Sequence, residues 1–289
     1  MPHAKSTDGV RLYYEEVGAG IPLLFIHEFA ADYMSWEPQM RYFARRYRCI
    51  SYSARGYTPS DIPTGADAYG YERFRDDAIA VLDHLRIAKA HIVGLSMGGY
   101  STLHIGMRHP SRALSLTLAG TGSGSDRAAA DDFRTSCNAT AALFDSGGSG
   151  EVAKHYGMGP TRIPFEVKDP RGFKEFFDAL SRHNAKGSAH TLRGFQAGRP
   201  SIYDFEDDIR RIALPTLIIV GDEDEPCVQP SLFLKNTIAT SGLAMFPKSG
   251  HTVNLEEPAL FNQTLDAFLA LVDAGRWNAR DPRSVRTAR

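Results

Sequence analysis

The sequence predicts an α/β fold: a mostly parallel central sheet with helices on both faces and an inserted helical lid. Short apolar runs such as 22–27 and 90–95 have the composition of strands buried on both faces. They alternate with helical segments such as 71–87, where Phe74 and Ala78 begin an apolar stripe at helical spacing. This alternation is typical of parallel sheets covered by helices.

The other elements follow from the same patterns. Pro258 opens the last helix and Gly275 ends it, as capping preferences predict. The full set of expected strands is 10–17, 22–27, 48–53, 90–95, 114–119, 214–221 and 242–247. The expected helices outside the lid are 34–47, 71–87, 97–110, 231–238 and 258–275.

The alternation is interrupted by residues 121–208, which contain helical patterns but no convincing strand. We interpret this segment as a helical lid with a flexible break at 145–150, inserted into a core made of 1–120 and 209–275. The end of the chain, 276–289, holds five arginines and no apolar periodicity, so we expect a flexible basic tail.

The composition excludes several classes of function. A net charge of −1 gives no electrostatic case for nucleic acid or an anionic membrane as partner. The three cysteines are not spaced for a disulfide framework or a zinc site, so we expect no metal. The N-terminus is polar and no run approaches a membrane span, which favours a cytoplasmic location.

The clearest chemical signal is Gly94-Leu95-Ser96-Met97-Gly98, between an expected strand and an expected helix. A serine on a sharp, strained turn is lifted above the sheet edge, and only glycine fits two residues to either side. Ser96 is therefore the candidate nucleophile.

A serine hydroxyl needs a base to remove its proton and an acid to orient that base. His251 is the candidate base, because it lies in a loop between the last apolar strand and the final helix. Asp224, in the acidic loop after the strand at 214–221, is the candidate acid, with Asp222 as the alternative. All three candidates leave the carboxyl ends of predicted strands, which meet at one edge of a parallel sheet.

The stretches GLSMGG, GDEDEP, SGHTVNLEEP, HEFAADYMSW and ARGYTPSD resemble the α/β-hydrolase superfamily, in particular its lid-bearing esterase-like branch. The resemblance covers nearly the whole chain except the lid and the tail. It implies an oxyanion hole formed by the backbone N–H groups of Phe29 and Met97. Where the family usually has His-Gly-X, this chain has Glu28 in place of the glycine. Glu28 either points away and binds a neighbouring loop, or lines the pocket and disfavours anionic substrates or positions water.

The resemblance implies a serine hydrolase that cleaves carboxylic esters of small, largely apolar molecules without a cofactor. Trp36, Tyr100 and Val253 are expected, with Glu28, along the substrate pocket. Lactonase and carbon–carbon bond hydrolase activities use the same triad and stay open, as does a cofactor-free haloperoxidase activity. Dehalogenases and epoxide hydrolases are disfavoured, since their nucleophile is an aspartate. A ligand receptor derived from a hydrolase is the alternative of another class.

Overall fold

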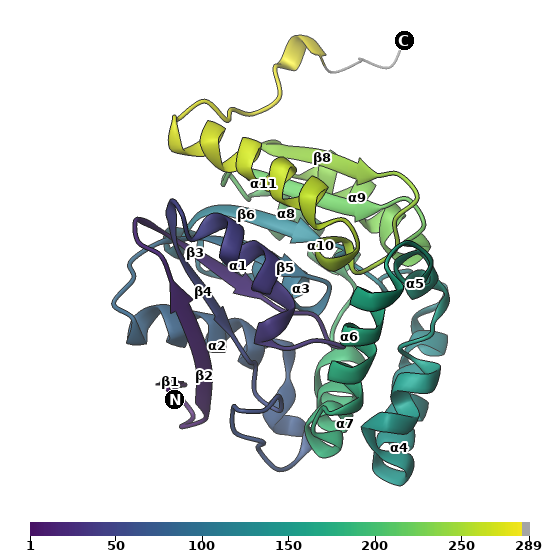
Figure 1. The fold of residues 1–289 in the computed structure, drawn as a ribbon. Helices are drawn as coiled ribbons and strands as arrows, with labels where there is room; N and C mark the ends of the chain where they lie inside the picture. The colour runs from purple at the N-terminus through teal and green to yellow at the C-terminus, as the bar shows by residue number, and fades with distance from the viewer. Residues whose placement is uncertain (285–289) are drawn as a thin grey trace.

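An eight-stranded sheet runs through the computed structural model, which describes residues 1–284 (Figure 1). The strand order is β1-β2-β4-β3-β5-β6-β7-β8; β1 and β2 run antiparallel to their neighbours and the other strands are parallel. The strands are β1 (His3–Lys5), β2 (Arg11–Val17), β3 (Ile21–Ile26), β4 (Tyr47–Tyr52), β5 (Ala90–Leu95), β6 (Ala113–Ala119), β7 (Thr216–Gly221) and β8 (Ser241–Phe246). The predicted fold class is confirmed, and β1 was not predicted.

Helices cover both faces of the sheet, because the parallel strands are apolar on both sides. Leu23 and Phe25 of β3 belong to one buried cluster together with Phe261 of α11. Leu24, from the same strand, belongs to the opposite cluster together with Leu103 of α3. The helices outside the insertion are α1 (Glu37–Phe43), α2 (Tyr71–His84), α3 (Met97–Arg108), α9 (Glu225–Thr237), α10 (Val253–Glu256) and α11 (Pro258–Asp273).

The register of the parallel strands brings their carboxyl ends to one edge. Leu95 at the end of β5 pairs with Ala119 at the end of β6, and Ala119 pairs with Ile219 near the end of β7. Gly221 of β7 then pairs with Phe246 of β8. The loops that follow these four strands therefore leave the sheet side by side.

Between β6 and β7 the described chain forms helices only, and Figure 1 shows α4 to α7 gathered at the lower right, beside the sheet. The prediction of a flexible break at 145–150 is wrong, because these residues lie within α4. Only Gly148 departs from helical geometry, with φ 72° and ψ −178°, so two helical pieces meet there. The helices of the insertion are α4 (Ala130–His155), α5 (Ile163–Lys168), α6 (Pro170–Ser181), α7 (Ala185–Thr191) and α8 (Glu206–Arg210).

Part of the predicted tail packs against the core. Trp277 Nε1 donates a hydrogen bond to the carbonyl of Thr240 at 2.7 Å, and its ring meets Phe268 edge to face at 4.6 Å. The tail is therefore not free from residue 276 onward, as the sequence suggested. The predicted flexible tail continues to 289, and its last part, 285–289, lies outside the described residues. Of the helices formed by residues 1–284, none has the length and apolar composition that crossing a bilayer requires.

Candidate active site

Ser96 occupies the sharp turn between β5 and α3. Its φ of 55° and ψ of −110° put a side-chain-bearing residue in a region that usually takes glycine. Its carbonyl accepts the first helical hydrogen bond from the N–H of Tyr100, at 2.8 Å. From 90 to 106, Ser96 is the one residue that is not buried. The turn thus presents the Ser96 side chain to the outside of an otherwise closed core.

The glycines beside Ser96 are required by close backbone contacts. A Cβ at Gly94 would collide with the carbonyl group of Gly98, across the turn. A Cβ at Gly98 would collide with the carbonyl of Ile26, and would lie 2.8 Å from that of His27. The tightness of the turn thus explains Gly94, and its close contact with the end of β3 explains Gly98.

His251 and Asp224 form a buried hydrogen-bonded pair. His251 Nδ1 lies 2.7 Å from Asp224 Oδ2, and the two residues are 7% and 1% exposed. A carboxylate can only accept, so Nδ1 carries the proton and Nε2 is left with its lone pair. Asp222 is exposed and instead accepts from the N–H of Ser249 at 3.2 Å. Of the two acids weighed from the sequence, the structure places Asp224 beside the histidine.

The same segment of chain touches both Ser96 and the His251 ring. The N–H of Ser96 donates to the carbonyl of Ala119 at 2.8 Å. The next residue is Gly120, where a Cβ would lie 3.3 Å from both Cε1 and Nδ1 of His251. The imidazole thus packs on the end of β6, directly beside the strand end that carries the serine.

Cys227 lies near both the His251 ring and Gly120. Its Sγ is 3.9 Å from His251 Nδ1 and donates to the carbonyl of Gly120 at 3.3 Å. Burial holds the pKa of this thiol well above its ordinary value, so it stays protonated. Among residues 1–284, Asp224, Cys227 and His251 are the one trio whose ligand atoms could reach a common metal ion. Because two of the three already hydrogen-bond each other, we interpret the trio as an acid–base pair with a neutral neighbour.

The carboxylate of Glu28 is paired with a guanidinium from the insertion. Arg162 Nη1 donates to Glu28 Oε1 at 2.6 Å and its Nη2 donates to Oε2, with the side chains only 3% and 1% exposed. Burial is the largest single influence and would raise the pKa of Glu28, but the charge and hydrogen bonds of Arg162, with smaller contributions from its other neighbours, together lower that pKa. Of the possibilities left open by the sequence, this geometry fits a Glu28 that binds a neighbouring loop.

The segment that supplies Arg162 also holds the His251 loop. Arg162 Nη1 donates to the hydroxyl of Thr252, and the carbonyl of Thr161 accepts from the N–H of His251 at 2.9 Å. Farther along, Lys168 Nζ lies 2.9 Å from the buried carboxylate of Glu256. These positioning residues were missed in the sequence, where the only signal was an acid in place of a glycine at position 28.

The loop that would supply the second oxyanion donor is fixed by His27. The N–H of Ala54 donates to His27 Nε2 at 3.0 Å, so Nδ1 carries the proton and donates to the carbonyl of Glu28 at 2.6 Å. Burial lowers the pKa of His27 to about 4, which keeps it neutral near pH 7. Phe29 and Met97 are each 1% exposed and belong to the same buried cluster. Their role as oxyanion donors stays a prediction.

Two of the expected pocket residues lie elsewhere. Trp36 is fully buried, stacks on Phe25 at 5.0 Å and packs near Phe261 of α11; Val253 belongs to the same cluster. Both fill the core between the sheet and the α1 and α11 layer, so we withdraw their assignment to the pocket. Tyr100 points toward the insertion, and its hydroxyl donates to the carbonyl of Pro200 at 2.8 Å.

Comparison with known proteins agrees with this architecture. A family model described as alpha/beta hydrolase fold matches residues 21–258. The chain is 29% identical to a 3-oxoadipate enol-lactonase 2 of Acinetobacter baylyi, over 86% of this chain and 88% of the relative. It is also 29% identical to a 2-hydroxymuconate semialdehyde hydrolase of Pseudomonas sp., over 92% and 93%. A solved thermophilic esterase from Thermogutta terrifontis, with malate bound, has a TM-score of 0.84 and 25% identity, over 94% of this chain and 98% of that one.

Proposed function

The chain belongs to the alpha/beta hydrolase fold family, and we propose that it is a serine hydrolase that cleaves carboxylic esters of small, largely apolar molecules. The observation that carries the proposal is the buried Asp224–His251 hydrogen bond of 2.7 Å, formed beside the strand end that carries Ser96. An oriented imidazole beside the strand end that carries a partly exposed serine on a strained turn supports activation of that hydroxyl for attack.

In the proposed mechanism, Ser96 attacks the ester carbonyl while His251 Nε2 takes the hydroxyl proton. Asp224 holds the imidazole in the required tautomer and stabilises its charged form. The N–H groups of Phe29 and Met97 bind the oxygen that becomes negative. His251 then gives the proton to the departing alcohol, leaving an acyl group on the serine. Water, deprotonated by the same imidazole, releases the acid.

A lactonase is the second candidate, since opening a cyclic ester needs the same groups. It is favoured by the likeness to the enol-lactonase, which covers 86% of this chain. The likeness to the semialdehyde hydrolase keeps carbon–carbon bond hydrolysis as a further alternative. A ligand receptor with little turnover is the alternative outside hydrolysis, and repeated turnover would exclude it.

The test is a panel of chromogenic esters of increasing acyl length and of lactones of increasing ring size, assayed with the intact protein and with Ser96→Ala. We expect turnover by the intact protein and none above background by the variant. A serine-directed fluorophosphonate should label the intact protein only. Equal rates for the two proteins would remove Ser96 from the mechanism, and single-turnover behaviour would support a receptor.

A further inference from the structure

Arg199 is a guanidinium without an acidic partner, placed where the helical insertion rejoins the core. It forms no ion pair within the described part of the chain, and its Nη2 donates to the carbonyl of Ser123 at 2.6 Å. The guanidinium carbon lies 4.8 Å from the ring centre of Tyr100 and 5.7 Å from those of Phe133 and Phe195. Burial lowers the pKa of Arg199, as expected for a cation that has lost water without gaining an anion. Aromatic rings and one carbonyl thus hold the group, while its positive charge is not compensated.

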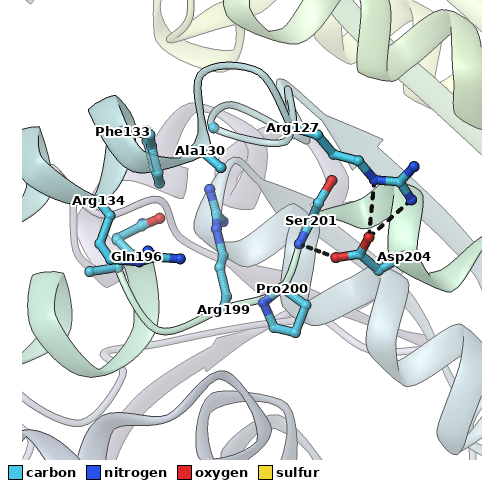
Figure 2. Close-up of a pocket in the computed structure, with 11 residues that line it drawn as sticks. Arg127, Ala130, Phe133, Arg134, Gln196, Arg199, Pro200, Ser201 and Asp204 are labelled. Atoms are coloured by element: carbon cyan, nitrogen blue, oxygen red, sulfur yellow. Dashed lines mark hydrogen bonds and ion pairs between the residues drawn. The ribbon is translucent and has the colours of Figure 1, made fainter.

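Arg199 stands in a cavity of about 260 Å³ whose lining carries three arginines and one acid. Figure 2 shows its side chain rising through the middle of this cavity toward the start of α4. Arg127 is paired with the acid, Asp204, at 3.0 Å. Arg134 is paired at 2.9 Å with Asp131, which is 94% exposed and does not line the cavity. Because exposed pairs of this kind contribute little free energy, Arg134 can turn toward a ligand at small cost.

A buried amide without a partner also faces this cavity. Gln196 is only 7% exposed and lines the same cavity as Arg199 (Figure 2). Its amide forms no hydrogen bond to any residue of 1–284, yet its atoms are not sealed from solvent. Buried polar groups are nearly always hydrogen-bonded, so an amide open to a cavity indicates a polar occupant. Of the Arg199 nitrogens, only Nη2 has a partner in the same range, which leaves Nε and Nη1 as further donors.

The cavity is separate from the candidate active site. It is not lined by Ser96, Met97, Phe29 or His251. Tyr100, whose ring lies against the guanidinium, is 1% exposed and is not part of the lining either. A ligand bound here is therefore distinct from a substrate held at Ser96, and the inference goes beyond the proposed function without depending on it.

We propose that this cavity binds a small oxyanion, a phosphate or carboxylate group, on Arg199, with Gln196 and Arg134 as further donors. The planar guanidinium matches either group through two parallel hydrogen bonds. Arg134 lies near the beginning of the insertion, whereas Gln196 and Arg199 lie near its end. A bound anion therefore connects the two segments through which the insertion leaves and rejoins the core, and it stabilises the folded protein.

The experiment is calorimetry at pH 7 with inorganic phosphate and, separately, with acetate, at an ionic strength held constant with sodium chloride. We expect the intact protein to bind at least one of the two anions with a Kd of about 1 mM or tighter. Arg199→Met should raise this Kd roughly 10- to 100-fold, as for a lost charged hydrogen bond, and Gln196→Leu roughly 2- to 10-fold. The anion that binds more tightly identifies the ligand group.

Thermal unfolding gives an independent readout. At about 20 mM, the preferred anion should raise the melting temperature of the intact protein by roughly 2–4 °C more than that of Arg199→Met. General effects of the salt on stability act on both proteins, so they cancel in this difference.

The matched control is Arg193→Met, because Arg193 lies six residues away in the same segment and is paired with Asp145 at 2.5 Å. It removes the same charge outside the cavity and should keep the affinity of the intact protein. Gln196→Leu changes no charge, so its result decides the question even if Arg199→Met does not fold. Binding of neither anion, an unchanged Kd in the cavity variants, or an equal loss in the control would overturn the proposal.

Discussion

Replacing Arg162 by methionine should destabilise the protein strongly, because the Glu28 carboxylate would stay buried without its partner. The pair is bidentate and its side chains are 3% and 1% exposed. Removing one member of such a buried pair costs about 3–5 kcal/mol of unfolding free energy. For a chain of this size each kcal/mol corresponds to about 2 °C, so the melting temperature should fall by roughly 6–10 °C.

The assay is urea and thermal unfolding at pH 7, followed by circular dichroism, for Arg162→Met, Glu28→Gln and the double variant. The double variant leaves neither charge unpaired, so its cost should be smaller than the sum of the single costs by about 2 kcal/mol. The control is Arg134→Met, which breaks an exposed pair with Asp131 and should cost less than about 0.5 kcal/mol.

The pH dependence gives a second test of the same pair. Arg162 holds the pKa of Glu28 below its ordinary value, so the pair contributes its full stability above that value and loses it as the pH falls. The difference between the intact protein and Arg162→Met should therefore stay constant from pH 7 to about pH 5 and shrink as the pH falls below 4.5. A cost below about 1 kcal/mol at pH 7, or strictly additive single variants, would refute the reasoning.

Three further results are expected. Asp224→Asn should lower kcat about 10³- to 10⁴-fold by favouring the wrong His251 tautomer, while Asp222→Asn stays within a few-fold of the intact protein; the opposite outcome would exchange their roles. Gly98→Ala should cost about 1–3 kcal/mol of stability, because its Cβ meets the β3 backbone, whereas Gly150→Ala, which has open space, should be neutral or stabilising in the same unfolding assay. Burial lowers the pKa of His104 to about 3, so the unfolded chain alone binds that proton below about pH 6.5, and stability falls toward acid pH. His104→Phe should remove about 2 kcal/mol of the loss seen between pH 7 and pH 5 in urea titrations.

Local patterns were sufficient to predict most of the sheet. The buried strands differ from their surroundings within six or seven residues, so their bounds were predicted to within one or two positions. β1 was missed because the three residues from His3 to Lys5 are too few to show an alternation. At Gly148 the glycine-rich stretch predicted a loop, but one residue with positive φ is enough to join two helical pieces.

The candidate catalytic residues were accessible from the sequence because they lie one to five residues after strand ends. Parallel register fixes where strand ends meet, so a residue's distance along the chain from such an end already restricts its position in space. The Glu28–Arg162 pair has no such guide, since 134 residues separate its members and the second comes from a helical insertion without strand register. The glutamate in place of the family's glycine was visible in the sequence, but nothing there identified Arg162 as its partner.

The pocket was predicted least well, and Trp36 and Val253 show why. Each lies near a candidate functional residue along the chain, but its helical phase turns it into the core beside α11. For a residue on a short helix, the sequence indicates which elements lie nearby but not the direction in which the side chain points. Arg199 is a similar case: the sequence does not distinguish it from a surface arginine, but its guanidinium packs against Phe195 and against Tyr100 in the first turn of α3. Pocket side chains thus depend on tertiary packing that the sequence does not show, whereas the placement of the candidate triad depends on the order of the strands.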